Sequence, residues 1–178
     1  PNAWNHGLWV GEPEVGVPLI VRGPRGAGLG SGVVVETPVS GVDVMPTVLE
    51  LAGVPTESGE LDGRSLAAAV RADGGGLMDR AVFSEATQPG ARLEAPGLGW
   101  RGELKPVAVR LGRWKLVRAG YLGLELLFDL NADPAEREDR LLGGGDEEAR
   151  AAAALLGDEL LRWRARAAPL PSEFDQEQ

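Results

Sequence analysis

Glycine and proline interrupt nearly every apolar segment of this chain. The sequence holds 26 glycines and 13 prolines among 178 residues, and no apolar run approaches the length of a membrane-spanning helix. Punctuation of this density favours short strands and helices joined by many turns. The pattern therefore argues against a fibrous protein, and we expect no membrane span.

Charge and cysteine content narrow the function further. The formal net charge is −9, which disfavours a protein that binds nucleic acid through its phosphates. Cysteine is absent, so disulfides, thiolate metal sites and cysteine nucleophiles are excluded within this chain. The absence of cysteine leaves the cellular compartment open. The first residue is Pro1, and we interpret the chain as a piece of a longer protein.

The first third of the chain predicts a strand–strand–helix order. Residues 17–22 form a continuous apolar run, typical of a strand buried on both faces of a mostly parallel sheet. Residues 33–35 predict a second short strand. Asp43 is a candidate N-cap for a helix that stops at Gly53. The predicted core side of this helix consists of Val44, Val48 and Leu51.

The pattern then changes to antiparallel strands and one long helix. A short helix is expected to begin at residues 62–66, and Gly112–Arg113 predicts a tight hairpin turn. The terminal helix is expected over residues 146–168, with acidic residues at its start and arginines at its end. Four strands are predicted at residues 81–85, 106–111, 114–118 and 125–130. The apolar stripe of the helix is Ala149, Ala153, Leu156, Leu160 and Trp163.

Two polar residues are candidates for a functional role. His6 is the only histidine, and no Gly-x-Ser-x-Gly elbow accompanies it, so its simplest interpretation is a surface or packing residue. Lys115 lies in a predicted strand beside Trp114, which we expect to pack against the small sheet. We expect Lys115 to be solvated, the alternative being that it points into a substrate cleft.

Taken in order, several segments resemble the C-terminal part of the sulfatase family, within the alkaline-phosphatase-like superfamily. Each segment is weak alone, but their common order across residues 5–140 is specific. The matching segments are residues 5–9 (Asn-His-Gly-Leu-Trp), 17–21 with Gly23-Pro24, 42–55 (Val-Asp-Val-Met-Pro-Thr-Val-Leu-Glu-Leu-Ala-Gly-Val-Pro), 62–66 (Asp-Gly-Arg-Ser-Leu), 82–85, 108–110 with 114–117, and 127–130 with Asp133-Pro134 and Glu136.

The resemblance implies an α/β, alkaline-phosphatase-like sulfatase fold, of which this chain would be the C-terminal part. Residues 1–56 would be the end of the catalytic α/β domain and its sheet. Residues 57–168 would form a small α+β subdomain, an antiparallel sheet with a C-terminal helix, and residues 169–178 a disordered tail.

The resemblance also implies chemistry that this chain does not contain. Sulfatases use a formylglycine made within a Cys/Ser-x-Pro-x-Arg motif, together with Ca²⁺, and cations offset the charge of the transferring sulfate. We expect the nucleophile and the metal ligands outside this chain, so that no residue here is catalytic or binds metal. Residues 87–92 imitate the motif, with threonine as the wrong nucleophile and the arginine one place late.

His6 is the one candidate substrate-binding residue, because Asn5-His6-Gly7 resembles a His-Gly-x-Trp stretch that borders the sulfatase active site. Family members have a basic residue soon after that stretch, whereas Glu12 and Glu14 here are expected to repel sulfate. The expected function is hydrolysis of sulfate esters, on a sulfated small molecule or glycan. The alternatives are a phosphonate or phosphodiester hydrolase, and a non-catalytic relative that binds a glycan or a protein.

Overall fold

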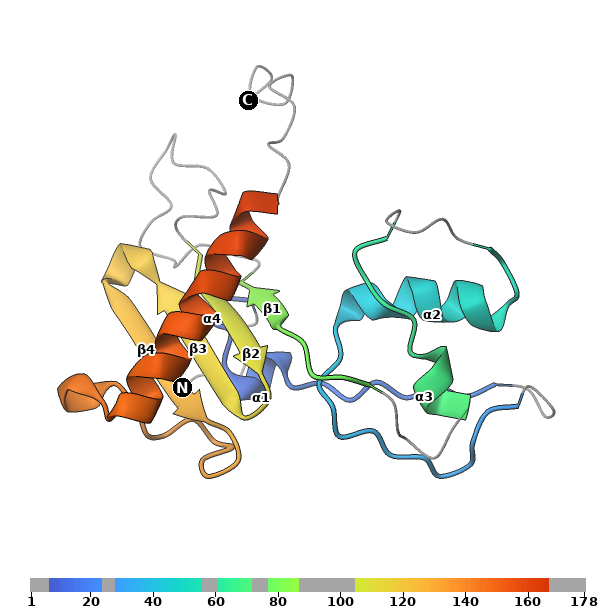
Figure 1. Ribbon diagram of the computed structural model, residues 1–178, viewed down its shortest axis with the longest axis horizontal. Helices are drawn as coiled ribbons and strands as arrows, with labels where there is room; N and C mark the ends of the chain where they lie inside the picture. Colours follow the sequence, from blue (N-terminus) through green and yellow to red (C-terminus); the bar gives the residue numbers. More distant parts are fainter. Residues whose placement is uncertain (1–6, 24–27, 56–60, 72–76, 87–104, 167–178) are drawn as a thin grey trace, which may run out of the picture.

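The computed structural model describes residues 7–23, 28–55, 61–71, 77–86 and 105–166. These residues form two parts that lie side by side (Figure 1). One part is a four-stranded sheet covered by the long helix α4 (Glu147–Arg166). The other part contains the helices α2 (Val44–Leu51) and α3 (Ala67–Arg71), which pack against each other. His6, residues 87–92 and the expected tail at 169–178 lie outside the described residues.

The sheet confirms the predicted antiparallel strands. Its order is β1-β2-β3-β4, and each strand pairs antiparallel with the next. The predicted turn joins β2 to β3. Its Gly112 has a φ of +56°, a backbone angle that residues with a Cβ rarely adopt. The strands are β1 (Val82–Glu85), β2 (Val107–Leu111), β3 (Trp114–Ala119) and β4 (Leu124–Asp129).

Helix α4 covers one face of the sheet, as its apolar stripe predicts. Leu156 and Leu160 are each only 1% exposed and pack against Leu116 and Leu127 of the strands. Near the end of the helix, the ring of Trp163 stacks on that of Phe83, with centroids 5.0 Å apart and planes within 5°. The helix and the sheet therefore form one continuous core. Trp114 is partly buried against the same core, as the sequence predicts.

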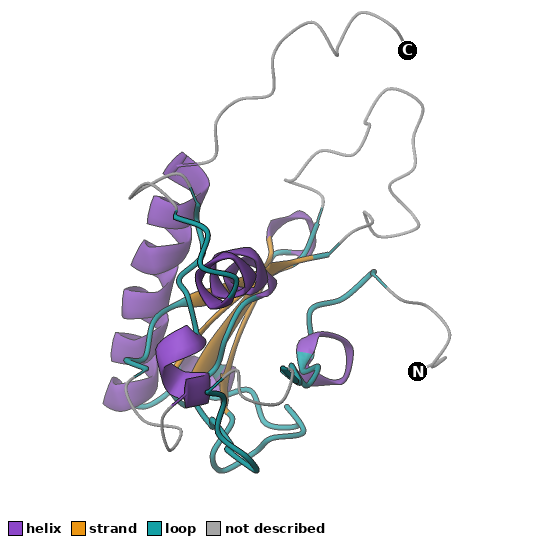
Figure 2. Ribbon diagram, turned by 90° about the vertical axis from the view of Figure 1, so that its right-hand side faces the viewer, coloured by secondary structure: helices purple, strands orange, loops and turns teal. Residues whose placement is uncertain are grey.

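The N-terminal segment covers the opposite face of the sheet (Figure 2). Val10 is fully buried there, and Trp9 and Val15 pack against the same cluster. This segment carries the four-residue helix α1 (Glu12–Val15). The buried members of the cluster are Val10, Ala86, Ala108, Val117, Phe128 and Leu130. A sheet covered on both faces can bury side chains of both orientations, including polar ones.

The second part is organised around the buried Asp43. Its carboxylate accepts hydrogen bonds from the backbone N–H of Ser40 and of Arg64, both at 2.9 Å, and pairs with the guanidinium of Arg80. Asp43 therefore caps the 3₁₀ helix at Gly41–Asp43 and ties two later segments to it. Asp43 is the N-cap residue of α2, as predicted, but its side chain makes no cap hydrogen bond to that helix.

Gly63 explains why the loop before α3 can approach Asp43 so closely. A Cβ at position 63 would lie 2.0 Å from the carbonyl oxygen of Val42, so a larger residue would displace backbone. Further on, the Leu66 N–H donates a 2.9 Å hydrogen bond to Thr47 Oγ1. The short helix expected to begin at residues 62–66 starts at Ala67 instead, because residues 62–66 form this contact loop.

Two predicted strands are absent from the structure. Residues 17–22 and 33–35 carry no strand assignment, and Val17 and Ile20 are 77% and 84% exposed. A buried strand needs hydrogen-bonding neighbours on its edges and helices on its faces. The described residues supply no strand neighbour for these segments, since all described strands belong to the β1–β4 sheet.

Two of the three residues predicted to form the core side of α2 are exposed, and the third, Leu51, is only partly buried. Val44 and Val48 are 41% and 57% exposed, whereas Pro46 and Thr47 are buried. The helix itself is confirmed, so the error concerns its packing partner and not its local structure. Within the described residues, no helix is both long and apolar enough to span a membrane.

Candidate functional site

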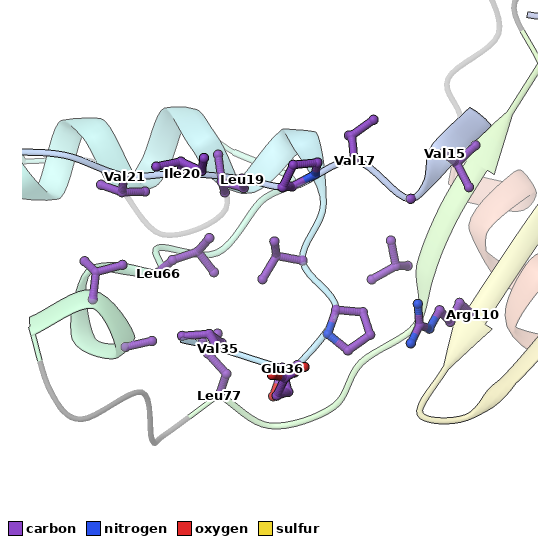
Figure 3. Close-up of a pocket in the computed structure, with 18 of the residues that line it drawn as sticks. Val15, Val17, Leu19, Ile20, Val21, Val35, Glu36, Leu66, Leu77 and Arg110 are labelled. Carbon is purple, nitrogen blue, oxygen red and sulfur yellow. The ribbon is translucent and has the colours of Figure 1, made fainter. Parts of the chain in front are cut away.

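A cavity of about 450 Å³ lies between the two parts of the molecule. Most of the residues that line it are apolar, and its polar side chains include Glu12, Glu36, Arg110 and Lys115. Figure 3 shows Val15 and Arg110 at the end beside the sheet, and Val21 and Leu66 at the opposite end. The charged residues are therefore gathered mainly where the N-terminal segment meets the sheet.

Two cations occupy neighbouring positions on the sheet face that α4 does not cover. Arg110 of β2 and Lys115 of β3 are directly paired across the two strands. Like charges in such a pair repel each other. Lys115 is also only 2% exposed, so its ammonium group requires a partner of opposite charge.

Two carboxylates neutralise this pair. Lys115 Nζ lies 2.8 Å from Glu12 Oε1 and 2.8 Å from Glu136 Oε1. The other oxygen of Glu12 lies 3.5 Å from Arg110 Nη1. The contact with Glu12 is a hydrogen bond, whereas the contact with Glu136 is an ion pair without hydrogen-bond alignment. We call Glu12, Arg110, Lys115 and Glu136 the charge cluster.

Glu136 enters the charge cluster from an unusual backbone conformation. Its φ is +54°, and it is the one non-glycine residue of the described chain with a positive φ. Glu136 Oε2 accepts a 2.8 Å hydrogen bond from the backbone N–H of Glu12. A non-glycine residue whose backbone lies in the left-handed region costs free energy that other contacts must offset. Its two oxygens supply such contacts, one with Lys115 and one with α1.

The other acidic residue of α1 holds the start of the described chain. Glu14 Oε2 accepts a 3.3 Å hydrogen bond from the backbone N–H of Gly7. Gly7 directly follows His6 in the sequence, and His6 itself lies outside the described residues. The expected repulsion of sulfate is thus offset at Glu12, which pairs with Lys115 and Arg110, whereas Glu14 keeps its charge beside a neutral backbone amide. Both carboxylates bind groups of this same chain.

Lys115 is likewise not the solvated lysine that we expected. The apolar alternation of β3 identifies which face Lys115 occupies, but both faces of this sheet are covered. Its two carboxylate partners lie 103 residues before it and 21 residues after it in the sequence. No local signal connects positions so far apart, so sequence reasoning missed the charge cluster.

The pKa of Asp43, which lies in the part of the molecule that contains α2, is shifted from its ordinary value. Burial acts to raise it, but the hydrogen bonds from the Ser40 and Arg64 backbone, and the guanidinium of Arg80, outweigh that effect. The pKa of this carboxyl is therefore held below its ordinary value. Asp43 is ionised at neutral pH and acts as a structural anion.

The residues of this chain do not fit the metal and nucleophile that the family resemblance implies. Among the described residues, no group of three or more His, Asp or Glu side chains could hold a metal ion. The full sequence contains no Cys/Ser-x-Pro-x-Arg motif in which a formylglycine could be made. The charge cluster offers its carboxylates to Lys115 and Arg110, so it is not a cation site.

Comparison with known proteins identifies the fold to which this architecture belongs. The solved structure of a phosphonate monoester hydrolase from Silicibacter pomeroyi matches with a TM-score of 0.59 and 26% identity, over 82% of this chain and 28% of that chain. No family model matches the sequence. The four-stranded antiparallel sheet with its terminal helix is the C-terminal portion of an alkaline-phosphatase-like fold.

Two curated relatives identify the protein family. Arylsulfatase K from Danio rerio is 36% identical over 123 residues, which are 67% of this chain and 21% of that protein. Choline-sulfatase from Rhizobium meliloti (strain 1021) is 36% identical over 136 residues, 73% of this chain and 23% of that protein. The chain belongs to the sulfatase family. It spans between a fifth and a quarter of the length of these relatives.

Proposed function

We propose that this chain forms the C-terminal part of a sulfatase that hydrolyses sulfate esters. The observation that carries the proposal is the sequence identity of 36% to two proteins named for sulfate ester hydrolysis. Their names include an arylsulfatase and a choline-sulfatase, so a small sulfated molecule or a sulfated glycan is the substrate class. In this assignment, residues 1–56 complete the catalytic α/β domain, and residues 57–168 form the small subdomain.

The arrangement around α1 supports a hydrolase over a merely binding relative. The absence of a basic residue between Trp9 and Val17, together with Glu12 and Glu14, favours the alternative of a non-catalytic relative. Because Glu12 is paired with Lys115 and Arg110 within the chain, its charge does not oppose an anion nearby. His6 remains our candidate substrate-binding residue. The formylglycine and Ca²⁺ of the family would be supplied by the part of the fold that this chain does not cover.

A phosphonate monoester hydrolase is the second candidate, because solved structures of that name share the fold at 26% identity. The residues that distinguish the two activities surround the nucleophile. The coding sequence on the N-terminal side of Pro1 is the first test. An in-frame Cys/Ser-x-Pro-x-Arg supports a hydrolase, and continuous sequence without it supports a non-catalytic glycan- or protein-binding protein.

The biochemical test compares the 178-residue chain with a protein that also contains that upstream part. We expect the chain alone to show no hydrolysis of 4-nitrophenyl sulfate above background, with or without added Ca²⁺, since it lacks the nucleophile. The longer protein should hydrolyse this sulfate ester faster than a 4-nitrophenyl phosphonate ester. The reverse preference would favour the phosphonate hydrolase. Turnover by the chain alone, abolished by a point substitution within it, would contradict the proposal.

A further inference from the structure

Arg64 and Arg80 meet at the buried carboxylate of Asp43. The backbone N–H of Arg64 donates to Asp43 Oδ1 at 2.9 Å, and the guanidinium of Arg80 pairs with the same oxygen. The guanidinium of Arg64 has a different acceptor, the carbonyl oxygen of Met78 at 2.6 Å. Among the described residues, Arg80 thus has one carboxylate partner, and the guanidinium of Arg64 has none.

Three nitrogen atoms of these two guanidinium groups are buried and unpaired. They are Nε and Nη2 of Arg64 and Nε of Arg80, and none of them donates to an acceptor in the part of the chain that the structure describes. Buried donors normally have a partner, and a charged donor without one is especially unfavourable. The observation therefore points to an acceptor that lies outside the described residues.

The missing acceptor has the chemistry of a carboxylate. The Nε–H and Nη2–H of one guanidinium form a planar fork that matches the two oxygens of a carboxylate. One further negative charge would also balance the two guanidinium groups, since Asp43 supplies only one. The Arg80 side chain is 29% exposed, and the contact between Arg64 and Met78 lies at the exposed surface. An acidic side chain can therefore reach the pair after a rotation of the guanidinium groups.

The surroundings of the pair indicate a protein surface as the source of this carboxylate. Val42 and Val44, on either side of Asp43, are exposed, and Met78 is 81% exposed. Exposed apolar side chains that are gathered in this way mark a surface that another part of a protein covers. The relatives are between four and five times as long as the part that this chain spans, so such a part exists in the family.

We propose that Arg64 and Arg80 bind the carboxylate of an Asp or Glu side chain in the part of the sulfatase fold that this chain does not cover. The pair is then a polar anchor within an otherwise apolar interface. Asp43 holds one side of the pair, and the incoming carboxylate takes the free fork of Arg64. The proposal rests on family membership and not on the proposed hydrolysis of sulfate esters.

The first test compares Arg64→Met in the 178-residue chain and in a protein that also contains the upstream part. This variant loses the guanidinium but keeps the backbone N–H that binds Asp43. The readout is amide exchange at Leu66, whose N–H donates to Thr47 Oγ1. We expect exchange to accelerate about tenfold or more in the longer protein, where a charge-assisted contact is lost, and to stay within about threefold in the chain alone.

Arg71→Met is the matched control, because Arg71 of α3 pairs at 3.1 Å with Glu50 and both side chains are exposed. We expect little change from it in either protein. If Arg64→Met prevents the longer protein from folding, Arg64→Lys replaces it, since lysine keeps the charge but loses the fork. Equal acceleration in both proteins would show that Arg64 acts within this chain. That result, or no acceleration in either protein, would overturn the proposal.

Inorganic sulfate distinguishes a carboxylate of the protein from a free anion. Sodium sulfate is compared with sodium chloride at equal ionic strength. In the chain alone, sulfate should slow exchange at Leu66, and Arg64→Met should abolish this effect; no such effect would contradict an oxyanion site at the pair. In the longer protein the carboxylate should exclude sulfate. An effect of sulfate there that depends on Arg64 would overturn the proposed partner. No readout uses hydrolysis, so failure of the proposed activity is distinguishable from failure of this proposal.

Discussion

At the scale of single residues, buried charges determine which segments of this molecule lie together. Lys115 and Asp43 are 2% and 0% exposed, and each is satisfied by partners from several segments. Isolated buried charges are strongly unfavourable, so each of these residues fixes the segments that neutralise it. Lys115 does so for the N-terminal segment and the sheet. Asp43 does so for the segments around α2.

Asp43 gives a prediction about pH. Its pKa is lowered in the folded protein, so the folded state binds fewer protons than the unfolded state in the acid range. The stabilisation is complete above the ordinary aspartate pKa and is lost as the pH falls through the lowered pKa. We expect Asp43→Asn to lower the free energy of unfolding at neutral pH by about 2 kcal/mol. The same substitution should flatten the acid side of the stability profile.

The measurement is urea denaturation followed by circular dichroism at a series of pH values. Asp62→Asn is the control, because Asp62 is an exposed aspartate of the nearby loop. Equal acid sensitivity in Asp43→Asn and in the unsubstituted chain would show that another carboxyl controls this range.

At the scale of elements, the sequence predicted what depends on local patterns. The four strands, the turn at Gly112 and helix α4 are all where periodicity and turn residues indicated. Residues 17–22 have the apolar run of a buried strand, yet form none. A strand is defined by its neighbours, and the neighbours are not contained in the run itself. The charge cluster could not be predicted from the sequence for the same reason, since the partners of Lys115 are remote in sequence.

Helix α4 offers a matched pair of leucines for testing the core. Leu156 is 1% exposed and faces the sheet, whereas Leu155 is 52% exposed. Leu156→Ala should lower the free energy of unfolding by about 2–5 kcal/mol, because it leaves a cavity in the core. Leu155→Ala makes the same chemical change in the same helix and should cost within about 0.5 kcal/mol. Thermal and urea denaturation of both variants measure the difference. Similar losses would mean that α4 does not pack as described.

At the scale of the whole molecule, the two parts differ in how much apolar surface they bury. The sheet and α4 share a continuous core, while apolar side chains at residues 17–21 and on α2 remain exposed. Exposed apolar residues gathered in this way mark a surface that another part of a protein covers. The relatives are between four and five times as long as the part that this chain spans. We propose that the rest of the sulfatase fold covers this surface.

This difference leads to a prediction about local stability in the 178-residue chain. Amide protons of β3 and β4 lie in paired strands beneath α4 and should open only on global unfolding. Residues 17–22 belong to no strand, so their amide protons should exchange close to the rate of an unfolded chain. Addition of the upstream part of the protein should then slow exchange at 17–22, because each buried Val, Leu or Ile side chain contributes roughly 1.5–3 kcal/mol. Hydrogen exchange followed by mass spectrometry measures both states. Strong and equal protection at 17–22 and in β3 and β4 of the chain alone would contradict this prediction. It would show that the chain is a self-sufficient domain, whose apolar surface needs no cover from the rest of the fold.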